Sequence, residues 1–136
     1  MSETEDRVAL VRRWVEKAEE DLVLAEHGLT MTERCPYDLI CYHAQQCAEK
    51  YLKALLAWQT LRVPRTHDLR FLVRQMPADL KLDTELDHVI TLNRYSIETR
   101  YPESWDDIER PEAERAIALA RAVRDAVRPT LPAAAL

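Results

Sequence analysis

The segment YHAQQCAEKYLKALL, residues 42–56, carries side chains that suit the binding of a phosphate or a base. Lys50 follows His43 by seven positions, and Lys53 follows Gln46 by the same spacing. On a helix these four groups and Glu49 fall within one sector of about 120°, which we call the polar stripe. Imidazole, amide and ammonium groups donate the hydrogen bonds that anionic oxygens accept. The stripe is therefore a candidate binding surface, and its simpler interpretation is the solvated face of a packing helix.

The remaining circumference of this helix is apolar, which indicates that it packs against other elements. Gln45 is the exception, because it falls among Leu52 and Leu56. An amide in that position is expected to be buried and to need hydrogen-bond partners inside the protein. The spacing contains no order of Ser, His and Asp and no set of metal ligands, since His43 and Cys47 supply only two of the four ligands of a closed site. We expect neither a metal nor a cofactor.

The elements that position these residues are expected to be helices. Alanine, leucine, glutamate and arginine dominate the composition, and they favour helix. The single glycine, Gly28, argues against β-hairpins, a dinucleotide-binding fingerprint and a P-loop, all of which need glycine. Helices are expected over about 5–29, 36–60, 67–75, 84–96 and 111–129. Short connections and the lack of strand signals predict an all-α fold, an up-and-down antiparallel bundle of four to five helices.

The first and last of these helices are expected to be amphipathic, with apolar residues at spacings of three and four. The inner faces are predicted to contain Val8, Val11, Val15, Ala18, Leu22, Ala25 and Leu29 in the first helix, and Ala113, Ile117, Ala120, Val123, Ala126 and Val127 in the last. Thr66 is expected to cap the short third helix. The chain of 136 residues is expected to form one domain over 1–136, with a loose tail from about 130 to 136.

The composition also bears on the compartment. The N-terminus is acidic and has no long apolar core, so we expect no signal peptide, and no apolar run is long enough to span a bilayer. The three cysteines are an odd number and are expected to be free thiols. The expected location is the cytoplasm, without contact to a membrane.

The charge of the chain is unevenly distributed. The net charge is −5, which argues against general binding of nucleic acid. The segment from Lys50 to Met76 nevertheless contains six basic residues and one acid, Asp68, which makes it +5 and the remainder −10. This segment is either a solvated basic loop and helix face or a local anion-binding surface on an acidic protein.

Four stretches of the chain resemble the HEPN domain family (higher eukaryotes and prokaryotes nucleotide-binding domains). They are WVEKAEEDLVLAE at 14–26, YHAQQCAEKYLKALL at 42–56, THDL at 66–69 and RYP at 100–102. The resemblance covers nearly the whole chain, and its most specific part is the second stretch followed about ten residues later by THDL. It implies an up-and-down bundle of four or five helices that is commonly dimeric. It also implies a role in toxin–antitoxin pairs, because many bacterial members are encoded with a minimal nucleotidyltransferase.

Many members of that family are metal-independent RNases whose signature, late in the chain, is Arg, four to six residues, then His. The arginine there would stabilise phosphate charge, and the histidine would transfer a proton at the 2′-hydroxyl. This chain departs from the signature, because Arg94 is followed by Arg100 and Tyr101 without a histidine. Arg62 and His67 have the spacing but lie earlier, where a match is expected by chance. The activity of the family is therefore not carried over to this chain.

The resemblance and the stripe together define a predicted site. We expect a ligand-binding surface made of His43, Gln46, Lys50, Lys53, His67, Asp68, Arg100 and Tyr101. If the protein is catalytic, the candidate residues are Arg94, Arg100 and His67. The alternative is structural: Thr66 and Asp68 cap a helix, His67 hydrogen-bonds across the bundle, and Arg100 belongs to a packed loop.

Three functions fit these observations. The first is a module that binds a nucleotide or RNA phosphate and is partnered with a minimal nucleotidyltransferase in a toxin–antitoxin-like pair. The second is a metal-independent RNase with a non-standard active site, and the third is a purely structural helical subunit. A homodimer is expected, because Trp14, Trp58 and Trp105 are large anchors for a thin bundle.

Overall fold

The computed structural model describes residues 2–60, 62–82, 86–96 and 107–136, and within these ranges every regular element is helical. Three long helices form the bundle: α1 (Glu3–Gly28), α2 (Tyr37–Thr60) and α5 (Arg110–Val127). Short helices complete it, namely α3 (Leu69–Arg74), α4 (Leu86–Ile90), η1 (Thr91–Tyr95), η4 (Arg128–Thr130) and η5 (Ala133–Ala135). The predicted all-α helical bundle is confirmed.

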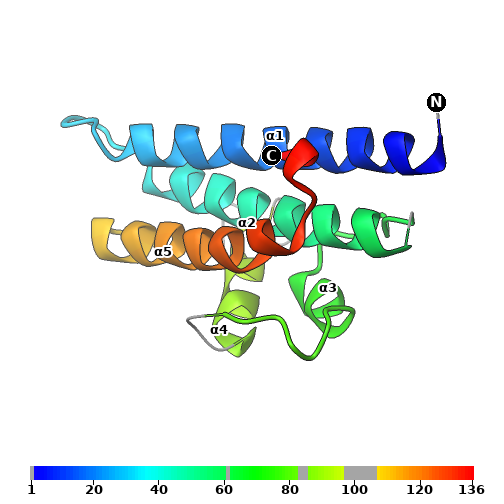
Figure 1. The fold of residues 1–136 in the computed structure, drawn as a ribbon. Coiled ribbons are helices and arrows are strands. Elements are labelled where there is room, and N and C mark those ends of the chain that lie inside the picture. Colours follow the sequence, from blue (N-terminus) through cyan, green and yellow to red (C-terminus); the bar gives the residue numbers. More distant parts are fainter. Residues whose placement is uncertain (1, 61, 83–85, 97–106) are drawn as a thin grey trace.

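Helix α2 is the centre of the molecule. It packs against α1 on one side and α5 on the other, and it also contacts α3 and η1. Figure 1 shows α1, α2 and α5 side by side, with α3 and α4 on the side of α2 that faces away from α1. Helices α1 and α2 run in opposite directions, whereas α5 runs in the same direction as α2. The predicted antiparallel order therefore holds for α1 and α2, whereas α2 and α5 are parallel to each other.

The predicted inner faces of the long helices are confirmed for most of their residues, whereas Val8, Leu29 and Ala126 are only partly buried. In α1 the buried apolar residues are Val11, Val15, Ala18, Leu22 and Ala25, and in α5 they are Ala113, Ala116, Ile117, Ala120, Val123 and Val127. Helix α1 begins with a capping box, in which the Ser2 hydroxyl accepts a hydrogen bond from the Glu5 amide and the Glu5 carboxylate accepts one from the Ser2 amide. These features explain why the long elements follow from the sequence.

The short helices differ from the prediction in their boundaries. The third helix begins at Leu69, two residues later than expected, because Asp68 is its N-cap and accepts a hydrogen bond from the Arg70 amide. Thr66 is not the cap, and its hydroxyl accepts a hydrogen bond from the Asp68 amide instead. Within the fourth predicted helix, α4 ends at Ile90 and the chain tightens into η1.

The end of the chain is ordered against α1, in contrast to the expected loose tail. Leu131 is 7% exposed and Ala135 is fully buried. The Arg12 guanidinium donates two hydrogen bonds to the Ala134 carbonyl, from Nε at 3.1 Å and from Nη2 at 2.5 Å. The tail is ordered because Leu131, which lies between Pro129 and Pro132, buries its side chain, and because Arg12 donates hydrogen bonds to a backbone carbonyl of the final turn. Figure 1 shows the C-terminus lying on the middle of α1.

Candidate functional site

The polar stripe of α2 is largely enclosed by neighbouring elements. Glu49 is 2% exposed and Lys53 is 5% exposed, and the side chains of His43 and Lys50 are about one-quarter exposed. The interpretation of the stripe as a solvated face is therefore wrong. Because buried charges need partners, the stripe is organised around two carboxylates, Asp21 and Glu49.

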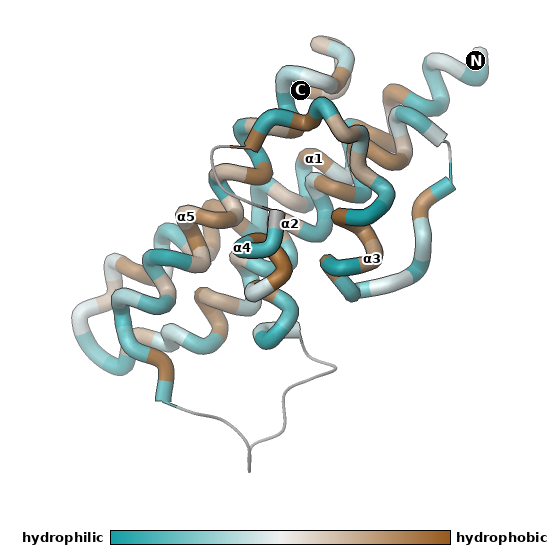
Figure 2. The backbone as a smooth tube through the Cα atoms, turned by 90° about the horizontal axis from the view of Figure 1, so that it is seen from below, coloured by the Kyte–Doolittle hydropathy of each residue, from teal (hydrophilic) through white to brown (hydrophobic). Residues whose placement is uncertain are grey.

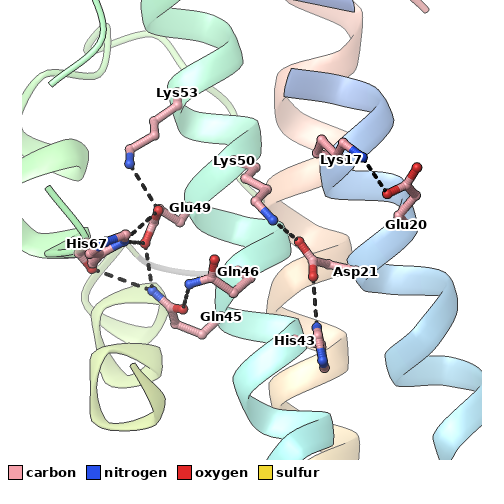
Figure 3. A network of polar contacts seen from close by, with 10 residues as sticks. All are labelled: Lys17, Glu20, Asp21, His43, Gln45, Gln46, Glu49, Lys50, Lys53 and His67. Atoms are coloured by element: carbon pink, nitrogen blue, oxygen red, sulfur yellow. Dashed lines mark hydrogen bonds and ion pairs between the residues drawn. The ribbon is translucent and has the colours of Figure 1, made fainter. Parts of the chain in front are cut away.

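The first carboxylate, Asp21 of α1, joins two members of the stripe. His43 Nδ1 lies 2.8 Å from Asp21 Oδ1, and Lys50 Nζ lies 2.5 Å from Asp21 Oδ2. Both α2 side chains reach the same carboxylate because two helical turns place them on one face of the helix. Figure 3 shows the three side chains meeting between α1 and α2.

The second carboxylate, Glu49, is satisfied within α2 and by the connector that follows it. It accepts hydrogen bonds from Gln45 Nε2 at 3.1 Å and from Lys53 Nζ at 3.0 Å, one turn away on either side. His67 Nδ1 lies 3.2 and 3.1 Å from its two oxygens. Gln45 is fully buried, as predicted, and its carbonyl oxygen accepts a hydrogen bond from Gln46 Nε2 at 2.6 Å. Figure 3 shows this cluster on the opposite side of α2 from Asp21.

Each carboxylate thus holds one lysine and one histidine. An ionised carboxylate can only accept hydrogen bonds, so Nδ1 of each imidazole ring is the donor in its contact with the carboxylate. Nε2 is then the ring nitrogen that can accept a proton from another group. The rings differ in exposure, since the side chain of His67 is 49% exposed and that of His43 is 26% exposed. His67 is an imidazole oriented by a buried carboxylate and open to solvent, an arrangement that suits binding of an anion or transfer of a proton.

Asp68 is committed to local structure. Its carboxylate accepts from the Arg70 amide at 2.9 Å and from Asn93 Nδ2 at 2.8 Å, and Asn93 Oδ1 accepts from the Leu69 amide at 2.7 Å. These bonds fix the start of α3 against η1. The capping alternative for Asp68 is thus present in the structure, and a ligand contact would compete with it.

Arg94 lies at a different place in the bundle. Its guanidinium is 3.6 Å from Glu112 of α5 and 5.4 Å from the centre of the Tyr95 ring, and the Tyr95 hydroxyl donates to Glu112. Burial and this hydrogen bond raise the pKa of Tyr95 above its usual range. These side chains and His88 line a cleft of about 580 Å³ between η1 and α5. Arg100 and Tyr101, the other late candidates, lie outside the described residues.

The basic segment divides into two parts. Lys50 and Lys53 are paired with Asp21 and Glu49 and contribute little free positive charge. The arginines of the connector and α3 are exposed, and within the described ranges no carboxylate forms an ion pair with them. We call Arg62, Arg65, Arg70 and Arg74 the arginine surface. His67 lies within the same stretch of chain, so the exposed positive charge flanks the ring that Glu49 holds.

Sequence reasoning missed the carboxylates at the centre of this arrangement. Asp21 had a signal, because it lies three residues after Ala18 and four before Ala25 and so falls on the buried face of α1. Glu49 falls within the predicted stripe, but its position in the sequence does not indicate that Gln45, Lys53 and His67 all bind to its carboxylate. Asn93 had no signal, since its partners Asp68 and Leu69 are distant in sequence.

Two further findings concern the described residues. They contain no group of three or more His, Cys, Asp or Glu side chains arranged to hold a metal ion. None of their helices is long and apolar enough to cross a membrane.

Comparison with known proteins identifies the family. The chain is similar to the protein TT1696 from Thermus thermophilus, with 30% identity, a TM-score of 0.75, and coverage of 89% of this chain and 98% of the other. It is also similar to ST0689, an archaeal HEPN homologue, with 27% identity, a TM-score of 0.65, and coverage of 97% and 100%. No curated protein matches it. The HEPN domain matches residues 11–129, and the chain belongs to the HEPN domain family.

Proposed function

We propose that the protein is a binding module for RNA or nucleotide phosphates and that the arginine surface and His67 form its contact site. The observation that carries the proposal is the contrast between the two sets of cations. Lys50 and Lys53 are neutralised by Asp21 and Glu49, whereas the arginines of the connector and α3 are exposed without ion pairs among the described residues. Exposed guanidinium groups bind phosphate oxygens well, often with two parallel hydrogen bonds.

The polar stripe has a supporting part in this proposal. Glu49 fixes the position of the His67 ring, and Lys53 and Gln45 fix Glu49. The sequence predicts that His43, Gln46, Lys50 and Lys53 touch the ligand, and Lys53 would have to leave a buried ion pair to do so. We therefore assign direct contact to the exposed residues and positioning to the stripe.

Binding of RNA by the purified protein tests this function. We expect the Arg70→Ala/Arg74→Ala variant to bind a labelled RNA more weakly and with a smaller salt dependence, because each lost phosphate contact on a single strand lowers the salt slope by about 0.7. Arg13→Ala/Lys17→Ala is a matched control, since it also removes two cations four residues apart from an exposed helix face. Equal binding by both variants would exclude the arginine surface.

A metal-independent RNase is the second candidate function, and the contact between Glu49 and His67 favours it. A solvent-exposed imidazole held by a buried carboxylate can act as a general base toward a 2′-hydroxyl. Cleavage of RNA in the presence of EDTA, lost in the His67→Ala variant, would support this activity. Cleavage that persists in the His43→Ala/His67→Ala variant would assign it to other residues, among them Arg94 or Arg100.

The proposal includes partners that the family resemblance implies. We place the protein in the cytoplasm as a homodimer that pairs with a minimal nucleotidyltransferase in a toxin–antitoxin-like system. Exposed apolar side chains on α1, among them Val23 and Leu24, are of a kind that an interface covers. Trp14 and Trp58 do not support the dimer, because the cations of Lys53 and Arg7 lie over their rings within one chain. Sedimentation of only a 15.8 kDa species at tens of micromolar would exclude the dimer.

A further inference from the structure

The outer face of α3 combines an aromatic ring with two cations. In this helix Leu69, Leu72 and Val73 are buried, which leaves Arg70, Phe71 and Arg74 on the opposite side. Phe71, the only phenylalanine of the chain, is 45% exposed. No ring or cation of the described residues is placed against it. Figure 2 views the molecule from the side on which this helix lies.

The exposure of Phe71 has no explanation in the packing of the described residues. A buried phenylalanine contributes apolar area to a core, whereas an exposed one leaves much of its ring in water. Leu72 and Val73 already fill the inner side of the same helix, and Asp68 with Asn93 already fixes its start. An exposed ring beside two arginines that form no ion pair within the described ranges has the composition of surfaces that bind unpaired nucleic-acid strands.

We propose that the outer face of α3 binds an unpaired nucleic-acid strand, with a base stacked on Phe71 and the adjacent phosphates on Arg70 and Arg74. This inference rests on the proposed function and deepens it, because it excludes a duplex and a free mononucleotide as the preferred ligand. Bases in a duplex are stacked on one another and do not offer a face to the ring. A mononucleotide offers one base but lacks the neighbouring phosphate that the second arginine would contact.

The experiment compares ligands and variants in one binding assay. The probes are an oligouridylate of about 10 nucleotides, the DNA strand of the same length, the corresponding RNA duplex and uridine monophosphate. We expect Phe71→Ala to weaken binding of the RNA strand and of the DNA strand about tenfold, because the ring contacts the base and not the sugar. The weak binding of the duplex is expected to stay unchanged, because its bases are not available to the ring. Leu39→Ala, which removes another exposed apolar side chain on α2, is the control and is expected to bind as wild type.

Two further variants separate stacking from packing. Phe71→Leu keeps an apolar side chain without an aromatic face and is expected to lose as much affinity as Phe71→Ala. Phe71→Trp is expected to retain binding and to show quenching of the new tryptophan's fluorescence when the strand is added. Circular dichroism checks that each variant is folded.

The outcomes distinguish this inference from the function on which it rests. Wild-type binding that depends on Arg70 and Arg74 but not on Phe71, or equal losses for single strand and duplex, would overturn the stacking proposal alone. No binding of any probe by the wild type would overturn both proposals. If Phe71→Ala dissociates an oligomer in the absence of nucleic acid, the ring belongs to a protein interface and the stacking proposal is wrong.

Discussion

At the scale of single residues, the chemistry of this protein is governed by two carboxylates that lie among apolar side chains. Asp21 is 8% exposed and Glu49 is 2% exposed. Each is compensated by one lysine and one histidine, so that neither buried charge is left alone. Removal of either carboxylate therefore leaves a lysine without its counter-charge. The resulting loss in the free energy of unfolding depends on how well water reaches that lysine.

Glu49→Gln is expected to lower the free energy of unfolding by about 3 kcal/mol, because it leaves the buried ammonium of Lys53 without a counter-charge. Urea unfolding measures the change. Glu49→Gln/Lys53→Met, which removes both charges, is expected to recover most of the loss. Glu20→Gln breaks an exposed pair with Lys17 and serves as the control, with an expected change below about 1 kcal/mol. A loss for Glu49→Gln as small as that of the control would contradict the prediction.

The stability of the protein is expected to fall at alkaline pH. Burial raises the pKa of the Cys41 thiol from 9.0 to about 12 and the pKa of the Tyr51 hydroxyl from 10.0 to about 12. The unfolded chain releases these protons first, so the stabilisation is complete below pH 9 and is lost as the pH rises toward 12, by about 1.4 kcal/mol per pH unit for each group.

Urea unfolding at several values between about pH 8 and about pH 11 tests this expectation. The Cys41→Ala variant is expected to show a shallower fall with pH than the wild type, whatever its stability at neutral pH. Parallel curves for the two proteins would show that Cys41 does not contribute to the pH dependence.

At the scale of elements, α2 determines the architecture because it contacts α1, α5, α3 and η1. The chain leaves α1 at Gly28, and at that point α2 approaches closely. A Cβ atom on Gly28 would lie 2.9 Å from Cγ1 and 3.1 Å from Cδ1 of Ile40, which is 2% exposed. The only glycine of the chain is therefore required by packing and not by a special backbone conformation, since its φ is not positive.

Gly28→Ala is expected to destabilise the protein by about 1 kcal/mol, because overpacking against Ile40 outweighs the helix propensity that alanine gains. Thermal unfolding measures the change. In the background of Ile40→Val, whose side chain is smaller, Gly28→Ala is expected to cost less stability than it costs in the wild type. The comparison is between Gly28→Ala/Ile40→Val and Ile40→Val alone. An increase in stability for Gly28→Ala would mean that Ile40 moves aside without cost.

The elements also show how far the sequence predicts the structure. Periodicity was sufficient for α1, α2 and α5, because long amphipathic patterns depend on the chain itself. It failed for the start of α3, where Asp68 and not Thr66 is the cap and Asn93 holds Asp68 from a distant position, and for the tail, where Arg12 supplies a distant contact. In the site, the burial of Gln45 followed from its place on the helix, whereas the hub role of Glu49 depends on His67 and could not be read from spacing.

At the scale of the whole molecule, charge is segregated. The chain has a net charge of −5, yet the four exposed arginines of the arginine surface fall within 13 consecutive residues, from position 62 to position 74. Polyanions are attracted to such a surface at about 0.1 M salt even when the protein as a whole is acidic, because screening then limits the range of the repulsion from the distant acidic groups to about 10 Å.

The protein is therefore expected to be retained on heparin at low salt and also on an anion exchanger. Arg70→Glu/Arg74→Glu is expected to abolish retention on heparin and to strengthen retention on the anion exchanger. The matched change Arg13→Glu/Lys17→Glu alters the net charge equally and is expected to preserve heparin binding. Equal effects of the two variants would show that net charge and not its location governs the interaction.

The placement of charged partners along the chain has a consequence for synthesis. Asp21 meets His43 and Lys50, and Glu49 meets Gln45 and Lys53, so the main partners of both carboxylates lie within the first two helices. When α2 has left the ribosome and α5 has not, the nascent hairpin of α1 and α2 can already neutralise both acids. The last polar contact of the cluster forms when His67 follows and closes over Glu49, and the contacts with α5, which include the ion pairs of Arg121 with Glu26 and of Arg124 with Glu19, form after it.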